Sequence, residues 1–377
     1  MFGGLQFGLL LACIVLFVPM VMAGWHLSRN KMLFFSGALF ISLAVCVHLT
    51  PYFPSVSDFV TSVQSVVIFD NRDDSCINLV NEVVWDMKPM REELLVAEPD
   101  GDNVGGVSSA VAFEKNWGWS KSWKVMACEF QKLGKGDISD LLNGSWVVVA
   151  GDSQSRLVVQ SLLGLVLNSE RMESIKEELF RRHSDYGIVV EEMGMKLDFV
   201  WAPYVANLSN LMMGFKQNKS YPDVLVMGAG LWHMLHFTNA SSYGVDLKSL
   251  RSSVVSLLPL APELGTDGPV MGTVSVRSPH LFWLGMPMLI NGMLNTEEKR
   301  EKLSDEMWHA YDKVLRDSRL LHRYGGPCLL LDIQSLSWNC GPRCTVDGMH
   351  YDGAVYEAAV QILLNALLIE SHQKLAT

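Results

Sequence analysis

The chain has 377 residues, enough for one large domain, or two small ones, with a hydrophobic core. Hydrophobic residues make up 49% of it and the mean hydropathy is +0.19, which is high for a fully soluble protein and indicates membrane segments. The formal net charge of −10 argues against a nucleic-acid partner, because phosphate binding requires clustered Lys and Arg. A neutral or weakly charged substrate fits this composition better.

The first 50 residues predict a membrane anchor made of two apolar helices. Residues 1–25 carry no charged side chain, and a second apolar run covers residues 32–50. A helix needs roughly 20 such residues to cross the bilayer. Because Arg29 and Lys31 lie between the two runs, the positive-inside rule places the connector in the cytoplasm and the large C-terminal part in the lumen. A cleaved signal peptide is the alternative for the first run, although no Lys or Arg precedes it.

Two further features fit a luminal compartment. Four N-x-S/T sequons follow the apolar runs and are predicted glycosylation sites: Asn143, Asn207, Asn218 and Asn239. Five of the seven cysteines also lie there, where disulfides can form: Cys76, Cys128, Cys328, Cys340 and Cys344. Because five is an odd number, at least one of them is expected to stay free or to pair outside the chain.

Residues 51–142 predict a loop-rich lead-in, because acidic and Gly-rich stretches separate short apolar pieces. This lead-in is expected to pack on a catalytic domain over residues 143–377, where strand-like and helix-like segments alternate. The first buried strand is expected at 146–150, with a helix directly after it. Further strands are expected at 187–190, 197–201, 223–227, 281–285 and 329–333, and helices at 247–258, 297–315 and 353–369. This order predicts a three-layer α/β domain with a mostly parallel sheet.

The segment Gly151-Asp152-Ser153-Gln154-Ser155-Arg156 follows the first predicted strand. A serine at this position can present its hydroxyl at the carboxyl edge of the sheet, where ligands bind in such folds. Backbone N–H groups at the start of the following helix can stabilise a developing oxyanion. The same residues also fit an ordinary helix start in which Asp152 or Ser153 caps the helix. This segment alone leaves both interpretations open.

The segment Asp347-Gly-Met-His350 lies just before the last predicted helix. A hydroxyl nucleophile needs a general base, and the base needs an acceptor that fixes its tautomer. His350 and Asp347 can supply both from one turn. A surface turn with unrelated polar groups is one alternative, and a metal site is another. The metal site is disfavoured because one Asp and one His fall short of a ligand set. No metal and no cofactor are expected.

A serine after the first strand, followed much later by Asp and His before the last helix, resembles the SGNH/GDSL hydrolase superfamily. Within it, G-D-S-x-x-R with a late D-x-x-H is similar to the PC-esterase group. That group includes the plant trichome-birefringence-like polysaccharide O-acetyltransferases and the luminal domain of sialate O-acetyltransferases. The resemblance covers about residues 76–377 and includes the Trp-rich segment 119–123 and the strand-and-glycine segment 223–232. It implies a three-layer, flavodoxin-like fold.

The resemblance also implies catalytic roles. Ser153 is the implied nucleophile, His350 the general base and then acid, and Asp347 the partner that orients it. Many SGNH enzymes carry an Asn in the segment that here reads Gly-Ala-Gly, so the side-chain oxyanion donor is missing. Backbone N–H groups of Ser153, Gly228 and Gly230 are expected to replace it, because glycine permits close approach of the backbone.

Further residues have expected roles beside the triad. Arg156 and Asp152 are expected to contact the substrate, with a structural salt bridge as the alternative for Arg156. Cys76 is the implied disulfide partner of Cys128. Structural roles are expected for three histidines that lack a carboxylate at a comparable spacing: His233, His236 and His280.

The expected function is a membrane-anchored, luminal serine acyltransferase that O-acetylates a glycan, or another hydroxyl-bearing acceptor, through an acyl-enzyme. An acyl donor is then required, with an acetyl-CoA derivative as one candidate. A separate protein is expected to supply it, because the chain ends after the catalytic domain. The alternatives are a carbohydrate or lipid acylesterase with the same triad, and a non-catalytic glycan-binding protein on the same scaffold. Likeness to the family favours the Golgi membrane, with the endoplasmic reticulum as the alternative, and a bilayer anchor at residues 1–50.

Overall fold

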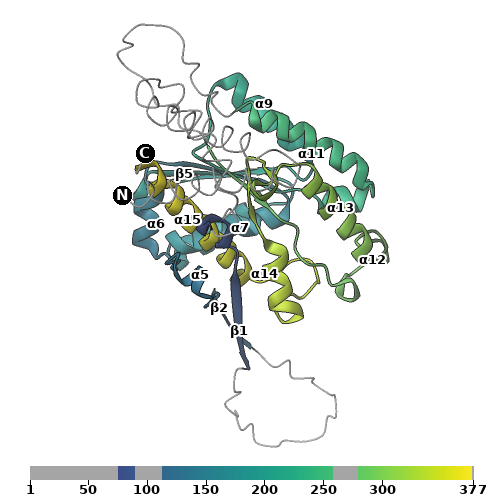
Figure 1. The fold of residues 1–377 in the computed structure, drawn as a ribbon, viewed down its shortest axis with the longest axis horizontal. Helices are drawn as coiled ribbons and strands as arrows, with labels where there is room; N and C mark the ends of the chain where they lie inside the picture. Colours follow the sequence, from purple (N-terminus) through teal and green to yellow (C-terminus); the bar gives the residue numbers. More distant parts are fainter. Residues whose placement is uncertain (1–74, 90–112, 258–278, 376–377) are drawn as a thin grey trace, which may run out of the picture. The chain divides into compact units, whose positions relative to one another are not determined.

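The computed structural model describes residues 75–89, 113–257 and 279–375. The expected membrane anchor at residues 1–50 lies outside these ranges, as do Cys13 and Cys46. The described residues belong to one compact unit. Its arrangement of helices and strands is shown in Figure 1.

A six-stranded sheet in the order β4-β5-β3-β6-β7-β8 forms the centre of this unit. Five strands run parallel, and β4 pairs antiparallel with β5 at one edge. The strands are β3 (Trp146–Gly151), β4 (Tyr186–Val190), β5 (Met195–Trp201), β6 (Val224–Met227), β7 (His280–Leu284) and β8 (Leu329–Leu331). The expectation of a mostly parallel sheet is therefore confirmed, and each predicted strand lies within a few residues of its expected position.

Strand β3 shows how the sequence divides the core between the two faces of the sheet. Val147 and Val149 belong to one hydrophobic cluster, whereas Val148 and Ala150 belong to another. Successive side chains of a strand point to opposite faces, so a continuous apolar run must be covered on both sides. Helices cover both faces, which confirms the three-layer α/β architecture.

The first face of the sheet packs against α6 (Lys135–Leu142), α7 (Ser153–Val166), α8 (Ser169–Leu179), α14 (Ile333–Cys340) and α15 (Gly353–Leu375). The second face packs against α9 (Val205–Asn218), α10 (Leu231–His236), α11 (Ala240–Val255) and α13 (Asp305–Asp317). Helix α12 (Glu297–Lys302) has no buried residue and contacts α10. Figure 1 shows the second group, in green, on the opposite side of the sheet from α6 and α15. The helix expected at 297–315 is in fact two helices, because Ser304 caps the start of α13 by accepting a hydrogen bond from Met307 N.

Helix α15 holds the lead-in through two buried amide side chains. Gln361 exchanges two hydrogen bonds with the backbone of Leu133, and Asn365 exchanges two with Gln131. These bonds satisfy polar groups that would be costly to bury unpaired. Among the described residues, Gly353–Glu370 of this helix is the one stretch long and apolar enough to cross a membrane, and 67% of it is buried inside the protein.

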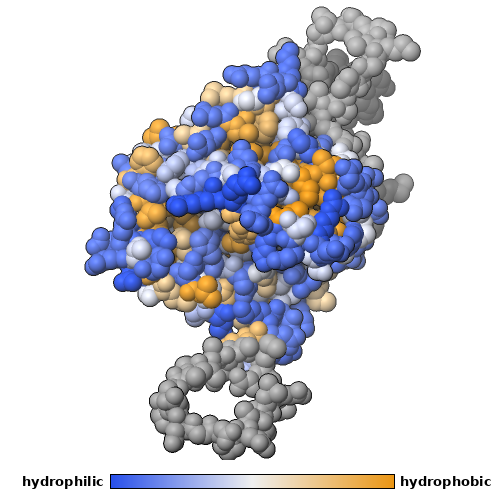
Figure 2. Space-filling model, turned by 180° about the vertical axis from the view of Figure 1, so that it is seen from behind, coloured by the Kyte–Doolittle hydropathy of each residue, from blue (hydrophilic) through white to orange (hydrophobic). Residues whose placement is uncertain are grey.

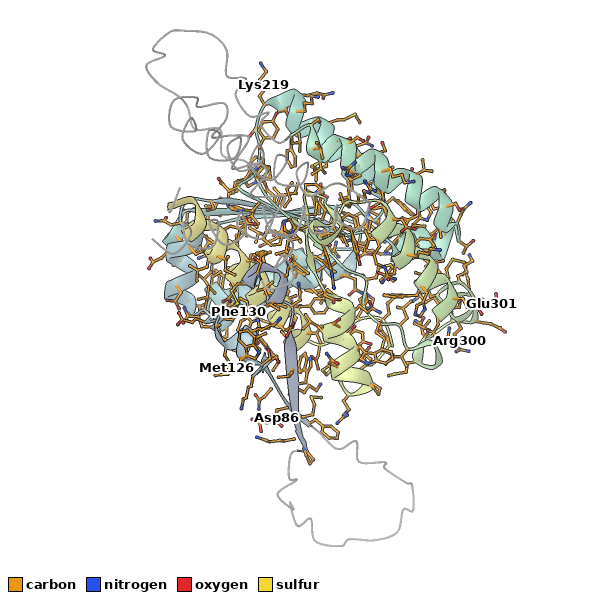
Figure 3. The ribbon with its side chains drawn as sticks, viewed as in Figure 1. Asp86, Met126, Phe130, Lys219, Arg300 and Glu301 are labelled. Atoms are coloured by element: carbon orange, nitrogen blue, oxygen red, sulfur yellow. A yellow bond between two sulfur atoms is a disulfide. The ribbon has the colours of Figure 1, made fainter. Side chains whose placement is uncertain are left out.

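The described part of the lead-in is more regular than its expected loop-rich character. An antiparallel pair, β1 (Val83–Pro89) and β2 (Phe113–Trp119), precedes α5 (Trp123–Met126). The implied disulfide is confirmed, because Cys76 in α4 (Cys76–Leu79) bonds to Cys128. Figure 3 labels Met126 and Phe130, which follow the start of α5. Met126 is exposed, whereas Phe130 is partly buried and packs against the core. The surface seen in Figure 2 mixes hydrophilic and hydrophobic residues in small patches.

Candidate active site

The carboxyl end of β3 runs directly into the first turn of α7. A Cβ on Gly151 would approach the carbonyl oxygen of Gly228 to 2.5 Å, so the tight passage requires glycine. Asp152 then caps the helix, its Oδ1 accepting a hydrogen bond from Gln154 N at 2.9 Å. Ser153 is the first residue of the helix. The segment is therefore a capped helix start with Asp152 as the capping residue, and this leaves the Ser153 hydroxyl free to act as a nucleophile.

Ser153, His350 and Asp347 are brought together although the serine and the histidine are 197 positions apart in the sequence. Ser153 Oγ lies 2.7 Å from His350 Nε2, and His350 Nδ1 lies 2.7 Å from Asp347 Oδ2. All three side chains are partly exposed, so the histidine is open to solvent. This is the geometry of a nucleophile, a base and an orienting acceptor.

The loop that carries His350 is held by a compact set of hydrogen bonds. Asp347 Oδ1 accepts from the backbone N–H groups of Met349 and His350, at 2.9 and 2.7 Å. Thr345 Oγ1 accepts from Gly348 N at 3.0 Å and donates to the His350 carbonyl at 2.7 Å. Burial alone would raise the pKa of Asp347, but the hydrogen bonds from His350 and the two backbone N–H groups outweigh it and lower that pKa. Asp347 is thus held as a carboxylate.

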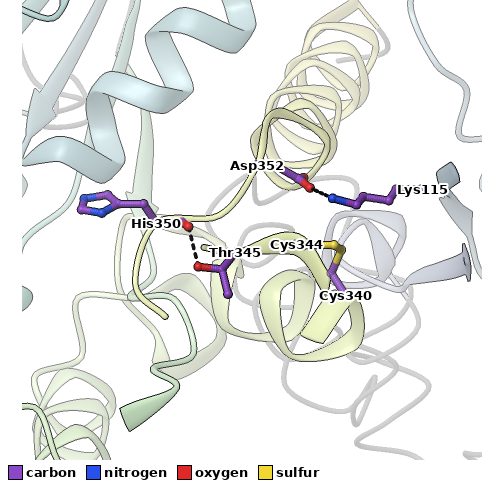
Figure 4. Close-up of a disulfide and its surroundings, with 6 residues drawn as sticks. All are labelled: Lys115, Cys340, Cys344, Thr345, His350 and Asp352. Atoms are coloured by element: carbon purple, nitrogen blue, oxygen red, sulfur yellow. Dashed lines mark hydrogen bonds and ion pairs between the residues drawn. A yellow bond between two sulfur atoms is a disulfide. The ribbon is translucent and has the colours of Figure 1, made fainter. Parts of the chain in front are cut away.

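A second disulfide joins Cys340 to Cys344, directly before this loop. Figure 4 shows it beside Thr345, whose hydroxyl reaches the His350 carbonyl, and near the ion pair between Lys115 and Asp352. The pairing leaves Cys328 as the free cysteine of the described residues, and it is buried. The odd cysteine expected from the sequence is therefore Cys328, one of the five cysteines that follow the apolar runs.

Asp152, the residue before the serine, is a second carboxyl group close enough to His350 to interact with it electrostatically. It is 4% exposed, and burial raises its pKa to about 6 in spite of the hydrogen bond from Gln154. The Gln154 side chain links the two halves of the site, because it donates to the Met349 carbonyl at 3.1 Å and accepts from the Tyr356 hydroxyl. The helix N-terminus and the His350 loop are therefore tied together by one amide.

The expected oxyanion donors do not all have a free N–H. Gly228 N donates to the Ala150 carbonyl at 3.0 Å, continuing the pairing of β6 with β3. The expectation for Gly228 is therefore wrong, because its N–H is already used by the backbone. Gly230 has a φ of +151° and a Cβ there would meet Met286 Sδ at 2.4 Å, so this position requires glycine. Among the hydrogen bonds of the described residues, the N–H groups of Ser153 and Gly230 have no acceptor.

A cavity of about 500 Å³ opens beside the triad. It is lined by Ser153, His350 and Arg156, and its walls include two aromatic side chains, Trp201 and Trp232. The two indole rings meet edge to face, with centroids 5.5 Å apart. A second cavity of about 580 Å³, bordered by α13 and β8, contains none of the triad residues.

Arg156 lines the catalytic cavity one helical turn after Ser153. Its guanidinium lies 4.9 Å from the ring centroid of Phe199 and 5.2 Å from that of Trp201, and it donates to the Ser184 carbonyl at 3.1 Å. No ion pair joins it to a carboxylate in the described ranges. The salt bridge that was the alternative interpretation is thus not formed there.

The other histidines differ in their surroundings. His233 is buried, and its Nδ1 lies 2.6 Å from the Tyr311 hydroxyl. His280 pairs with Glu370. His236 lies on α10 at the edge of the catalytic cavity. Two of the three therefore have the expected structural surroundings, whereas His236 lies within reach of a ligand.

The four sequons all have exposed asparagines: Asn143, Asn207, Asn218 and Asn239. Asn239 also caps α11 through its Oδ1, which leaves the amide nitrogen as the attachment atom. Asn218 is the last residue of α9, next to Lys219, whose side chain points outward in Figure 3. None of the four lines the catalytic cavity.

Comparison with known proteins places this site in a family. No protein-family model matches the chain. The chain is 64% identical over 380 residues to Protein ALTERED XYLOGLUCAN 9 of Arabidopsis thaliana, and the match covers all of both chains. The chain belongs to the trichome-birefringence-like group of the SGNH hydrolase superfamily.

Solved structures similar to this family member include TesA and a catalytic mutant of Axe2, an acetylxylan esterase from Geobacillus stearothermophilus. TesA is 14% identical, with a TM-score of 0.33, over 59% of this chain and 97% of its own. The Axe2 mutant is 13% identical, with a TM-score of 0.34, over 63% of this chain and 96% of its own.

Several residues of this SGNH site were not anticipated from the sequence. Thr345, Gln154 and Tyr356 act through hydrogen bonds between segments far apart in the chain. The cationic residues Arg182 and Lys299 reach the catalytic cavity from a loop and from α12. No local pattern marks these positions, because each gains its place only through the packing of other elements.

Proposed function

We propose that this protein is a membrane-anchored, luminal serine acyltransferase that O-acetylates a glycan. The observation that carries the proposal is the hydrogen-bonded series Ser153–His350–Asp347 at the carboxyl edge of the sheet. Membership of the trichome-birefringence-like group supports acyl transfer to a polysaccharide.

The geometry supports a double displacement. Ser153 Oγ attacks the acyl carbonyl of the donor while its proton moves to His350 Nε2, 2.7 Å away. The N–H groups of Ser153 and Gly230 are the candidate donors to the oxyanion that forms. His350 then protonates the leaving group, and an acyl-serine remains. An acceptor hydroxyl, deprotonated by His350, attacks this ester and regenerates Ser153. The donor is consumed, so one must be supplied, and we propose a separate supplier.

The walls of the cavity support a carbohydrate acceptor. Trp201 and Trp232 are partly exposed and line the same cavity as Ser153. The Trp201 ring already stacks with His183 and lies under the Arg156 guanidinium, so its exposed edge and the Trp232 ring are the surfaces that can contact a sugar. The relative's name connects that protein with xyloglucan, which is consistent with a hemicellulose-type glycan.

The esterase alternative uses the same triad with water as the acceptor, so only an experiment on the reaction separates the two. The full chain in detergent is incubated with a neutral activated acetyl ester, and the mass of the Ser153 peptide is measured. We expect acetylated Ser153 in the wild type and none in Ser153→Ala. Ser161→Ala changes a serine two turns further along α7 and should behave like the wild type. No acetylation of the wild type, or equal acetylation of Ser153→Ala, would contradict the proposal.

Addition of oligosaccharides to the acetylated protein then identifies the acceptor. Acetylated sugar indicates a transferase, and free acetate alone indicates an esterase. The Golgi location is proposed from family likeness. Glycans on the four sequon asparagines should resist the endoglycosidase that removes high-mannose chains if the protein leaves the endoplasmic reticulum. Full sensitivity would instead indicate retention there.

A further inference from the structure

Arg156 is a buried cation without a carboxylate partner among the described residues. Only 6% of its surface is exposed, and its Nε has no hydrogen-bond acceptor. One N–H group reaches the Ser184 carbonyl, and Phe199 and Trp201 offer their ring faces. Ring faces compensate a buried charge only in part. Such an incompletely satisfied charge is unfavourable for folding, which points to a ligand.

Arg156 lies where a ligand would be close to the reacting serine. It follows Ser153 by three residues on α7, and side chains with this spacing lie on the same face of a helix. Both residues line the same cavity as His350. A group bound by the guanidinium would therefore belong to a molecule that can also reach the nucleophile.

The rim of this cavity adds further positive charge. Arg182 and Lys299 line it, and within the described ranges neither forms an ion pair with a carboxylate. Asp152 is the one carboxyl group in the lining, and it caps α7, with burial raising its pKa to about 6. Glu298 lies close to His236 at the edge but is paired with Lys302.

This local charge is opposite in sign to that of the whole chain, which has a formal net charge of −10. A cavity lined by one sign of charge raises the local concentration of ligands of the other sign. The net charge of the sequence favoured a neutral or weakly charged substrate. Net charge, however, does not report where on the folded protein the charges gather. The cavity itself favours an anionic group.

We propose that the cavity beside Ser153 binds an oxyanion of the substrate, a carboxylate or a phosphate, with Arg156 as the central ligand and Arg182 and Lys299 at the rim. The planar guanidinium suits both groups through paired hydrogen bonds. The oxyanion has two possible sources: a uronic acid in the glycan acceptor, or a phosphate of the acyl donor. The assignment of the oxyanion to the acceptor or to the acyl donor rests on the proposed function, whereas the binding of an oxyanion in this cavity does not.

Two matched pairs of probes distinguish the sources. Trigalacturonic acid is compared with its neutral methyl ester, and coenzyme A with neutral pantetheine. Binding to full-length Ser153→Ala protein in detergent is measured by calorimetry, so the result does not depend on catalysis. We expect one charged probe to bind at least about tenfold more tightly than its neutral counterpart, as for hydrogen bonds to charged groups. Higher salt should reduce the difference.

Variants in the same background test the residues. Arg156→Gln should weaken binding of the charged probe about tenfold or more, and Arg182→Gln by a smaller factor. Arg181→Gln is the matched control, because it removes the same charge from the adjacent exposed residue, which does not line the cavity. If Arg156→Gln fails to fold, the double variant Arg182→Gln/Lys299→Gln is measured instead. Arg182 is exposed and Lys299 is half-buried, so weaker binding of the charged probe by this variant would support the site.

The outcomes separate the two proposals. The oxyanion site is overturned if neither charged probe binds better than its neutral partner. It is also overturned if the Arg181, Arg182 and Arg156 variants bind the charged probe equally well. Failure of the wild type to acetylate Ser153 overturns the proposed function, whereas the calorimetric result with the charged probes still stands.

Discussion

Two carboxyl groups near His350 have opposite pKa shifts because their surroundings differ. Asp347 is partly exposed and accepts several hydrogen bonds, so its pKa is lowered and it is a carboxylate over a wide pH range. Asp152 is buried, and desolvation raises its pKa to about 6. The first is suited to orient the imidazole and to stabilise its cation. The second holds the start of α7 and carries an electrostatic cost at neutral pH.

This cost gives a pH-dependent prediction for Asp152→Asn. Because the pKa of Asp152 is raised in the folded protein, its contribution to stability is complete below the unfolded value of about 4 and is lost as the pH rises through about 6. Asparagine also caps helices well, so the substitution removes the charge and keeps the acceptor oxygen. We expect the variant to be more stable than the wild type at about pH 7.5, by up to about 3 kcal/mol, and nearly equal at about pH 4.

The measurement for Asp152→Asn is the free energy of unfolding in denaturant at the two pH values. Asp140→Asn, an exposed aspartate on α6, serves as the control and should show no such dependence. The same difference between variant and wild type at both pH values would rule out the assigned electrostatic cost.

The element that positions the base is the loop between α14 and α15. It has no regular secondary structure over most of its length, yet Thr345, Asp347 and the Cys340–Cys344 disulfide hold it through side-chain bonds. Gln154 joins it to α7 from the other side. The base is thus fixed by several weak contacts, and loss of any one should alter its position before it alters the fold.

Thr345→Val tests this positioning role. Valine keeps the shape of threonine but removes the bonds to Gly348 N and the His350 carbonyl, so we expect the rate of Ser153 acetylation to fall about 10- to 100-fold. The KM for the ester should change little, because Thr345 does not line the cavity. Val346→Thr changes the neighbouring residue, which is 95% exposed, and should have the wild-type rate. An unchanged rate in Thr345→Val, or an equal loss in both variants, would refute the role.

The described part of the molecule contains two disulfides with different consequences. Cys76–Cys128 joins residues 52 positions apart and ties the lead-in together, whereas Cys340–Cys344 closes a loop of four positions beside the base. The entropy that a cross-link removes from the unfolded chain grows with the length of the loop it closes. Stability and activity should therefore depend on different bonds.

We expect Cys76→Ser/Cys128→Ser to lower the free energy of unfolding by about 4 kcal/mol, and Cys340→Ser/Cys344→Ser by about 2 kcal/mol. The rate of Ser153 acetylation, measured where each protein is folded, should fall more in the second pair, because that bond lies next to Thr345. Denaturant unfolding and acetylation rates are measured for both pairs. A larger loss of stability in the Cys340/Cys344 pair, or a larger loss of acetylation rate in the Cys76/Cys128 pair, would contradict this prediction.

The strands and the catalytic motifs could be predicted because each is encoded locally. A continuous run such as Val147–Ala150 can be satisfied only when both faces are covered, which indicates a buried parallel strand. The triad residues follow from chemical type and from their order along the chain. The β1–β2 pair was missed, because its apolar pattern is short and its structure depends on packing on other elements. Helix α9 was also missed, although its buried residues Val205, Leu208, Met212 and Phe215 recur at helical spacing.

Tertiary structure decided what the local patterns could not. The N–H of Gly228 is used by Ala150, 78 positions earlier in the chain, and Arg156 has no carboxylate partner in the described ranges although the chain is acidic. Both facts depend on which groups meet in space, whereas sequence periodicity reports only which side of an element is buried. The sequence by itself therefore determined the fold class and the triad. The fold determined which hydrogen bonds remain available and where positive charge gathers.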